Sequence, residues 1–260
     1  MASAMVGGLV RQGWPAAAIK VVEIAASARE RLEREHKVAA RATLDRDAAG
    51  SDCIVLAVKP QQVREAAQAL KPRLASQLVI TIAAGIRVKD LARWLGGYAV
   101  IVRAMPNTPA LAAAGISGLY ATRGVSAAGR ASAEKILGAV GSTLWVESED
   151  DLDAVTAVSG SGPAYVFYFI EALEQAAQEL GLSAAAARRL ALETFAGSVK
   201  LAAQAGEPPS TLRERVTSKG GTTERALKAL DAERVRDAIV LAVRAAAERS
   251  REIGEEFGKD

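Results

Sequence analysis

The sequence predicts an α/β domain built on a largely parallel, doubly wound sheet, followed by an all-helical region. Between Ile19 and Trp145 short apolar runs alternate with amphipathic stretches, which is the pattern of strands interleaved with helices. After Glu147 the strand pattern stops, and the rest of the chain shows only helical periodicity. We therefore expect two domains, the α/β domain over residues 1–147 and the helical domain over residues 148–260.

Each predicted strand is a short run of mainly aliphatic residues, and each predicted helix carries apolar residues three and four positions apart. The strands span residues 19–24, 38–42, 53–58, 78–83, 100–103, 118–121 and 144–146. The helices between them span residues 25–35, 61–70, 88–95 and 127–140. In the helical region, breaks at 181–183, 206–209 and 218–221 separate the helices. The helix over Tyr165–Leu180 is apolar around its whole circumference, so we expect it to be buried, with another subunit as one means of covering it.

The chain opens directly on a helix, over Met1–Gly13, which ends at a Gly-Trp-Pro stop signal. A doubly wound sheet normally begins with a strand and a Gly-rich turn that holds a cofactor pyrophosphate, so we expect this helix to follow such a turn. The next strand ends with Glu23, whose carboxylate is placed to accept bonds from ribose hydroxyls; a solvated charge at the sheet edge is the alternative. Glu23 disfavours a 2′-phosphate, whereas Ser27 and Arg29 offset that repulsion, so NADH and NADPH both stay open.

The composition argues against several classes of function. Lys and Arg number 33 against 30 Asp and Glu, and charges alternate along residues 28–35, so no basic face for nucleic acid forms. Aromatic residues make up 4% of the chain, too few for base-stacking platforms. The single Cys53 cannot form an internal disulfide, and the lone His36 has no cluster of ligands with which to bind a metal. No apolar run is long enough to cross a membrane and no signal segment is recognisable, so we expect a cytoplasmic protein without a membrane partner.

Three turns combine small or polar residues with the start of a helix or the end of a strand. Ser218-Lys219-Gly220-Gly221-Thr222-Thr223 opens a helix, where converging free N–H groups could hold a carboxylate; a helix cap closed by Thr222 or Thr223 is the alternative. Ser159–Tyr165 contains two glycines before a proline, and it either approaches a ligand or lets two helices cross closely. Asn107 follows a strand at the carboxyl edge, where ligands bind in open sheets, or it only nucleates a turn.

Together with Ala57-Val58-Lys59-Pro60 and Ile82–Ile86 at two further strand ends, these turns resemble those of pyrroline-5-carboxylate reductases in order and spacing along nearly the whole chain. The most specific segments are residues 157–165 and 216–223. The resemblance implies a Rossmann-type, dinucleotide-binding domain followed by an all-helical dimerisation and substrate domain. It further implies the last step of proline biosynthesis, the reduction of 1-pyrroline-5-carboxylate to L-proline with NADPH or NADH, by a homodimer that assembles into a larger homo-oligomer.

The resemblance also assigns roles to individual residues. Thr223 is implied to touch the imine nitrogen as the catalytic residue. The implied substrate contacts are Glu149, Ser218, Gly220, Gly221, Thr222 and Thr223. An acidic first turn of a helix is the alternative for Glu149. The implied cofactor contacts are Met1, Ala2, Glu23, Ser27, Val58, Lys59, Ala84 and Asn107. No metal is implied.

Two departures from the family pattern stand out. The family begins with a strand and a Gly-x-Gly-Asn-Met-Ala run, of which only Met1-Ala2 is present, so we expect weaker nucleotide binding than with that start. Lys219 stands where many relatives have Pro, which frees an N–H and adds a positive charge beside the carboxylate site.

The first alternative function is a related two-domain dehydrogenase, although the lysine that such enzymes use as an acid is absent from residues 144–199. The second is a catalytically impaired dimeric binding protein.

Overall fold

The computed structural model describes residues 1–259, which form two compact units. The first unit consists of Met1–Ser161 together with the chain from Ala246 onward, and the second consists of Gly162–Ala245. The first unit reaches past residue 147 because helix α7 (Asp151–Val155) packs on the sheet through the fully buried Leu152. The domain limits 1–147 and 148–260 stay a prediction.

The first unit contains every strand and helix that the sequence pattern predicts there, with shifted ends. Its strands are β1 (Lys20–Val22), β2 (Ala39–Arg41), β3 (Cys53–Leu56), β4 (Leu78–Thr81), β5 (Ile101–Met105), β6 (Gly115–Ala121) and β7 (Gly141–Trp145). Its predicted helices are α1 (Ala2–Arg11), α2 (Ala26–His36), α4 (Val63–Leu70), α5 (Val88–Trp94) and α6 (Ala127–Leu137). Two short elements lack a sequence signal of their own, α3 (Arg46–Ala49) and the π-helical turn Thr156–Gly160. Single-turn 3-10 helices are η1 (Ala16–Ala18), η2 (Pro60–Gln62), η3 (Lys71–Arg73), η4 (Thr108–Ala112) and η5 (Gly138–Val140).

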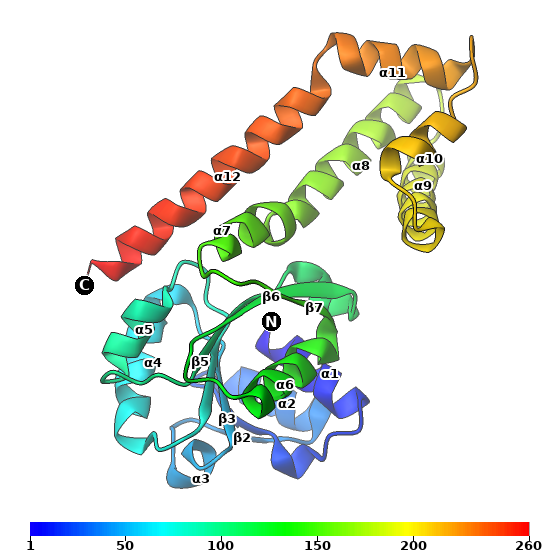
Figure 1. Cartoon of the computed structure of the whole chain (residues 1–260). Helices are drawn as coiled ribbons and strands as arrows, with labels where there is room; N and C mark the ends of the chain where they lie inside the picture. Colours follow the sequence, from blue (N-terminus) through cyan, green and yellow to red (C-terminus); the bar gives the residue numbers. More distant parts are fainter. Residues whose placement is uncertain (260) are drawn as a thin grey trace. The chain divides into compact units, whose positions relative to one another are not determined.

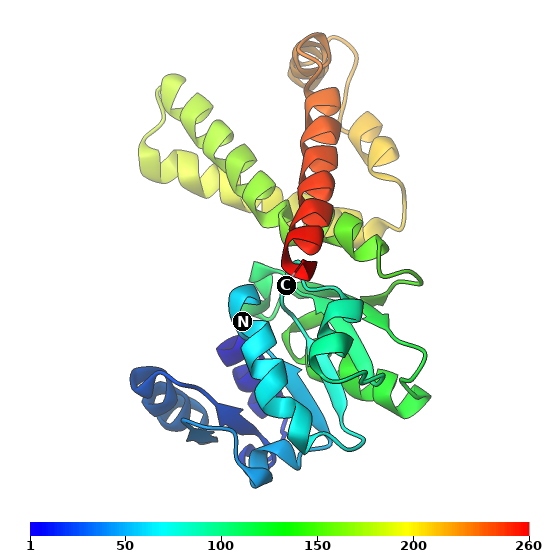
Figure 2. The same ribbon diagram turned by 90° about the vertical axis from the view of Figure 1, so that its left-hand side faces the viewer.

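The strands pair in two pieces. A five-stranded sheet has the order β3-β4-β5-β6-β7, and β1 pairs only with β2, in parallel, within residues 1–259. Figure 2 shows this pair as a separate piece at the blue end of the colour scale. In the larger sheet only β5 and β6 run antiparallel. The segment between β5 and β6 holds η4 and no crossover helix, so β6 cannot return to run parallel to β5.

Helices cover both faces of the five-stranded sheet (Figure 1). Side chains alternate along each strand, so Ile80 and Val102 face α1 and α6, whereas Val79 and Ile101 face α4 and α5. Gly8 is required in α1, because a Cβ there would collide with the carbonyl group of Ala139. The two cores fix the sheet between helix layers, and the carboxyl ends of β3, β4 and β5 meet at one edge.

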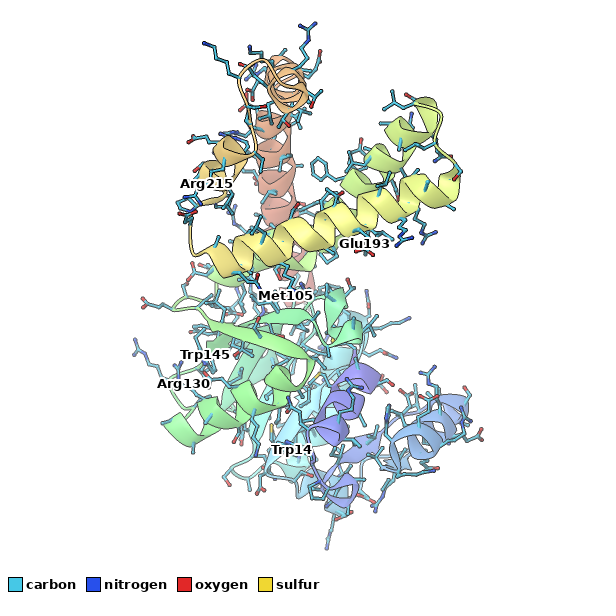
Figure 3. The ribbon with its side chains drawn as sticks, turned by 90° about the vertical axis from the view of Figure 1, so that its right-hand side faces the viewer. Trp14, Met105, Arg130, Trp145, Glu193 and Arg215 are labelled. Carbon is cyan, nitrogen blue, oxygen red and sulfur yellow. The ribbon has the colours of Figure 1, made fainter. Side chains whose placement is uncertain are left out.

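The last strand is tied to α6 by an aromatic contact. The Arg130 guanidinium lies 4.7 Å from the centre of the Trp145 ring, and the Trp145 indole N–H donates a hydrogen bond to Glu134 (Figure 3). A cation over an indole face contributes about 0.5–2 kcal/mol. This contact holds β7, the edge strand, against the helix layer.

The second unit is helical, as predicted, and three of its breaks fall at glycines. It contains α8 (Gly162–Glu179), α9 (Ala184–Ala205), α10 (Pro209–Arg215), α11 (Thr222–Ala232) and the first part of α12 (Val235–Gly258). Gly181, Gly206 and Gly220 have φ of 94°, 64° and 73°, a left-handed backbone that favours glycine. The break between α11 and α12 was not predicted, because it is made by Arg234 with φ of 53° and carries no glycine or proline.

Helix α8 contains no buried residue, so this chain alone does not provide the burial expected for the helix over residues 165–180, and cover by another subunit stays a prediction. Its large apolar side chains are exposed instead, and α9 and α12 carry more of them. The exposed apolar set is Val166, Phe167, Tyr168, Leu173, Leu190, Leu192, Val199, Leu201, Ile239, Val240 and Leu241. So many exposed apolar residues on neighbouring elements of one small unit indicate a protein interface.

Candidate active site

Four of the eight predicted cofactor residues follow the parallel strands β3, β4 and β5. Val58 and Lys59 come after β3, Ala84 after β4 and Asn107 after β5, and the N–H of Ile82 bonds to the Leu56 carbonyl at 3.2 Å, which keeps the first two strand ends together. Val58, Lys59 and Ala84 are exposed, and Asn107 is half-buried. The structure therefore brings these four residues to the edge of the sheet where ligands bind in open α/β folds.

Asn107 is held by hydrogen bonds from both sides of its amide. Its oxygen accepts a bond of 3.0 Å from the Ile116 N–H, and its nitrogen donates to the carbonyl and hydroxyl of Ser159, each at 3.3 Å. The next residue, Gly160, lies close to Met105; a Cβ on Gly160 would lie 2.7 Å from the Met105 Cε atom, which would then have to move. Two of the three sequence motifs thus meet at the end of β5, and a cofactor contact of Asn107 stays a prediction.

Glu23, Ser27 and Arg29 lie at the end of β1, in the smaller sheet. The Glu23 carboxylate accepts a bond of 2.9 Å from the Ala25 N–H, so one of its oxygens closes the turn into α2. Arg29 donates to the Glu23 and Ile24 carbonyls at 2.8 and 2.9 Å, and Ser27 is exposed in the first turn of α2. This arrangement places the Arg29 guanidinium against the backbone of Glu23. It leaves the choice between NADH and NADPH open.

Met1 and Ala2 form the exposed start of α1. The Met1 carbonyl accepts the Met5 N–H at 3.1 Å, and among the described residues no side chain caps the first turn of this helix. Uncapped N–H groups at a helix start attract anions. This geometry is compatible with the predicted place of both residues beside a nucleotide.

Glu149 bonds to two groups of the first unit. Its Oε1 atom accepts the Val88 N–H at 2.7 Å and lies 2.8 Å from the guanidinium of Arg103, whose side chain is 4% exposed. From the sequence, Glu149 is interpreted as a substrate contact or as part of an acidic first turn of a helix. The sequence does not indicate that Arg103 is its partner. The ion pair is a third role, and a substrate contact stays a prediction.

Apart from Glu149, the predicted substrate residues lie together in the second unit, in the turn before α11 and in the first turn of that helix. Gly220 has φ of 73° and Gly221 is the N-cap residue; a Cβ on Gly221 would lie 2.5 Å from the Ser218 hydroxyl. The Gly221 N–H bonds to the Ser218 carbonyl at 3.1 Å. The backbone of Gly220 therefore favours glycine, whereas a side chain at 221 would first displace the Ser218 hydroxyl. Ser218, Lys219 and Thr222 are exposed around the turn.

The alternative that Thr222 or Thr223 caps the helix is wrong. Residue 221 is the N-cap, and within residues 1–259 no side chain caps α11 there. Instead the Glu224 carboxylate reaches back and accepts the Gly220 N–H at 2.6 Å. The N–H groups of Thr222, Thr223 and Glu224 and the hydroxyl of Thr223 then have no hydrogen-bond partner in the described part of the chain. Free N–H groups at the positive end of a helix suit a carboxylate ligand.

Acid is expected to loosen this turn. The bond from the Gly220 N–H, and secondly Lys228, hold the pKa of Glu224 below its ordinary value. A carboxyl pKa that is lower in the folded state gives stabilisation that is present at neutral pH and lost as pH falls through the lowered pKa. The amide resonance of Gly220, followed by NMR, should titrate below the ordinary glutamate range and stop titrating in Glu224→Gln. A Gly220 resonance that titrates in the ordinary range would contradict the bond.

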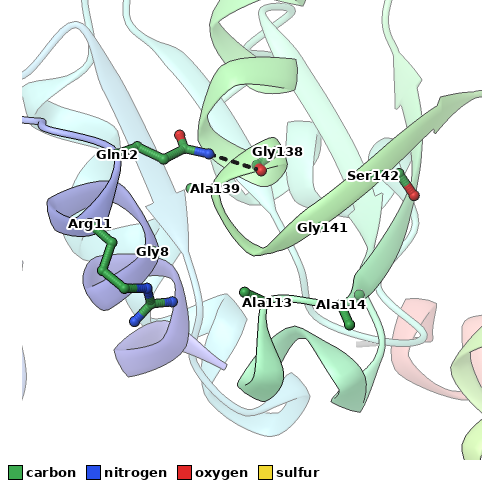
Figure 4. Close-up of a pocket in the computed structure, with 10 residues that line it drawn as sticks. Gly8, Arg11, Gln12, Ala113, Ala114, Gly138, Ala139, Gly141 and Ser142 are labelled. Carbon is green, nitrogen blue, oxygen red and sulfur yellow. Dashed lines mark hydrogen bonds between the residues drawn. The ribbon is translucent and has the colours of Figure 1, made fainter. Parts of the chain in front are cut away.

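A separate groove of about 630 Å³ lies between α1 and the starts of β6 and β7. Figure 4 shows Arg11 along its wall and the hydrogen bond of 3.2 Å that Gln12 donates to the Gly138 carbonyl. None of the predicted site residues lines this groove. It therefore plays no part in the site.

The described residues contain neither a membrane-spanning helix nor a cluster of metal ligands. None of the described helices combines the length and the apolar character that crossing a membrane requires. Within residues 1–259, no three His, Cys, Asp or Glu side chains gather as metal ligands. The Cys53 thiol is ionised with difficulty, because burial raises its pKa to about 12. A thiol that stays protonated is a poor nucleophile.

Comparison with protein families gives two matches that together span most of the chain. Residues 149–253 match the model described as pyrroline-5-carboxylate reductase dimerisation. Residues 1–85 match the model described as NADP oxidoreductase coenzyme F420-dependent.

Several individual proteins are similar over nearly their whole length. The pyrroline-5-carboxylate reductase of Pseudomonas aeruginosa is 44% identical over all of this chain and 95% of its own. Pyrroline-5-carboxylate reductase 2 of Bacillus subtilis is 35% identical over 99% of this chain and 93% of its own. The structure of the reductase from Coxiella burnetii superposes with a TM-score of 0.91 at 38% identity, covering 97% of this chain and 94% of that one. The Plasmodium falciparum enzyme, solved with NADP bound, gives a TM-score of 0.85 at 29% identity over 97% and 94% of the two chains.

Proposed function

Because the chain belongs to the pyrroline-5-carboxylate reductase family, we propose that it reduces 1-pyrroline-5-carboxylate to L-proline with hydride from NADPH or NADH. In this reaction the hydride adds to the carbon of the C=N bond, and the nitrogen gains a proton. The nicotinamide supplies the hydride when bound. The chain has to hold the two reacting carbons together and polarise the nitrogen.

The observation that carries the proposal is the turn before α11. Its three free N–H groups, at the positive end of an eleven-residue helix, match the carboxylate that the substrate carries. Charge-assisted hydrogen bonds of this kind contribute about 1.5–3 kcal/mol each. We assign the carboxylate and the ring to Ser218, Gly220, Gly221 and Thr222, with Lys219 adding positive charge nearby. The half-buried Thr223 hydroxyl, which has no partner within residues 1–259, is assigned to the imine nitrogen.

The carboxyl edge of the larger sheet supports the cofactor assignment. Val58, Lys59 and Ala84 are exposed there, so a flat ring can approach the backbone without displacing a packed side chain. The Glu23 carboxylate uses one oxygen on Ala25 and keeps the other for ribose hydroxyls, and the Arg29 guanidinium lies against the backbone of the same residue. The residues present therefore fit a dinucleotide, and this fit is the basis for assigning them to NADPH or NADH.

A direct assay tests the function. The chain is mixed with 1-pyrroline-5-carboxylate and NADPH or NADH, nicotinamide absorbance is followed, and proline is measured as product. We expect absorbance to fall only when the imine is present, with one proline formed per nucleotide oxidised. A β-hydroxyacid assayed with NADP serves as the control for the related dehydrogenases. Nucleotide oxidation without proline, or activity on the hydroxyacid alone, would overturn the assignment.

We also propose a homodimer formed through the apolar faces of α8, α9 and α12. The match to a dimerisation model over these helices supports it, as do the exposed Phe167, Tyr168 and Leu173. The larger homo-oligomer and the cytoplasmic location, expected from the family resemblance and the sequence, are proposed with it.

Charge on this face is expected to separate the subunits. Phe167→Asp puts a carboxylate into an apolar interface, where an unpaired charge is strongly unfavourable. Light scattering should show the wild type as at least a dimer at micromolar concentration and the variant as a monomer. Gln68→Asp, at an exposed polar position of α4 outside this face, should leave the mass unchanged. A monomeric wild type, or a dimeric Phe167→Asp variant, would rule out this interface.

A further inference from the structure

A buried charge cluster anchors the turn that follows β4. The Arg87 guanidinium lies 2.7 Å from the Asp153 carboxylate, and the Ser250 hydroxyl donates to the other oxygen of Asp153 at 2.7 Å. The side chains of Arg87 and Asp153 are 13% and 2% exposed. We call Arg87, Asp153 and Ser250 the anchor cluster. It joins the β4–α5 turn, helix α7 and the end of α12, three segments far apart in the sequence.

At two glycines beside the anchor cluster, Gly85 and Gly254, neighbouring atoms leave no room for a side chain. Gly85 has φ of 76°, and a Cβ there would collide with Ile253 and lie 3.0 Å from the Phe257 ring. A Cβ on Gly254 would lie 2.8 Å from Nε of Arg87. The last turns of α12 therefore lie directly against the turn that contains Ala84. A shift of either segment has to break contacts of the other.

Because the Asp153 carboxylate is buried, the anchor cluster is destabilised when either of its partners is lost. A carboxylate with 2% exposure is unfavourable unless its charge and its hydrogen bonds are satisfied, and Asp153 obtains both from Arg87 and Ser250. Glu149 adds a second bond to the same turn by accepting the Val88 N–H at 2.7 Å. Asp150 also lies 3.1 Å from Arg87, but its side chain is 85% exposed. An ion pair that exposed contributes little, so Asp153 carries the contact.

We propose that Asp153 is a positioning residue for the nucleotide, because through Arg87 it fixes the Ala84–Ile86 turn at the ligand-binding edge of the sheet. The effect on turnover rests on the proposed function, whereas the ordering of the turn does not. When the anchor cluster is broken, the turn moves relative to the ends of β3 and β5. Small displacements of a positioning group reduce binding and rate strongly.

The test compares Asp153→Asn with Asp150→Asn, which removes the same charge from the other partner of Arg87. In Asp153→Asn, the KM and the Kd for NADPH should rise on the order of tenfold, with less than about a twofold change in the KM for 1-pyrroline-5-carboxylate. Hydrogen exchange should accelerate on the order of tenfold at the amides of residues 84–88 and stay unchanged in α4. Asp150→Asn should leave all of these values within about twofold of wild type. Ser250→Ala, which keeps the ion pair, should give an intermediate effect.

A third variant separates positioning from loss of stability. Leu137→Ala lowers the melting temperature by thinning the core on the other face of the sheet, which contains no member of the anchor cluster and no residue of the Ala84–Ile86 turn. Its NADPH Kd should stay at the wild-type value although it melts earlier. A wild-type Kd and wild-type exchange at residues 84–88 in Asp153→Asn would overturn the positioning role. A wild type that binds NADPH but does not reduce the imine would instead overturn the proposed function and leave the exchange result to decide on Asp153.

Discussion

Replacing Thr223 with alanine is expected to lower kcat by about ten- to a thousandfold, the equivalent of roughly 1.5–4 kcal/mol of transition-state stabilisation. An imine accepts hydride readily only when its nitrogen is protonated or hydrogen-bonded. The Thr223 hydroxyl has no partner within residues 1–259, so it is free to donate such a bond. Since the bond strengthens as the nitrogen gains charge, the loss should appear in kcat more than in KM.

Melting and turnover together distinguish this role from a structural one. A capping threonine would lower stability by about 1 kcal/mol when replaced and leave turnover per folded molecule unchanged. Because Gly221 is the N-cap, Thr223→Ala should melt close to the wild type. Thr223→Ser keeps the hydroxyl and should retain most of the activity. Thr217→Ala is the matched control, because within residues 1–259 that hydroxyl bonds only to the Arg213 carbonyl, at 2.6 Å. Normal turnover in Thr223→Ala would remove the catalytic assignment.

The fold was predictable wherever a local pattern decides it. Seven apolar runs became strands, and the glycines at 181, 206 and 220 ended helices or shaped turns as their left-handed backbone requires. The direction of β6 was not predictable from its own residues, because it depends on a connection without a crossover helix. The π-helical turn at 156–160 and the left-handed Arg234 carry no residue signal. Tertiary packing overrides local propensity at such places.

The candidate site likewise has one part that the sequence predicts and another that it does not. The substrate turn could be predicted from Ser218 to Thr223 because one local sequence builds it. The partners of Glu149 and Asp153 could not be predicted from the sequence. Arg103 and Ser250 lie 46 and 97 residues away from them, and only the packed structure brings these side chains together.

The pair of Arg103 and Glu149 gives the largest expected effect on stability. Glu149→Leu leaves the guanidinium of Arg103, 4% exposed, without its counter-charge, and it also removes the acceptor of the Val88 N–H. Breaking one side of a buried ion pair costs about 3–5 kcal/mol, whereas replacing both partners by apolar residues costs much less. We therefore expect chemical denaturation to show a large loss in Glu149→Leu and in Arg103→Met, and a much smaller loss in the double variant.

The same cycle decides between the roles considered for Glu149. An acidic first helical turn contributes only about 0.3–1 kcal/mol and does not depend on Arg103, so it predicts losses that add. A substrate contact predicts that Glu149→Gln, which keeps the shape and the acceptor oxygen, raises the KM for 1-pyrroline-5-carboxylate at an unchanged melting temperature. The ion pair predicts the reverse, a lower melting temperature with an unchanged KM. Additive losses in the double variant would show that the 2.8 Å contact between Arg103 and Glu149 contributes nothing of its own to the fold.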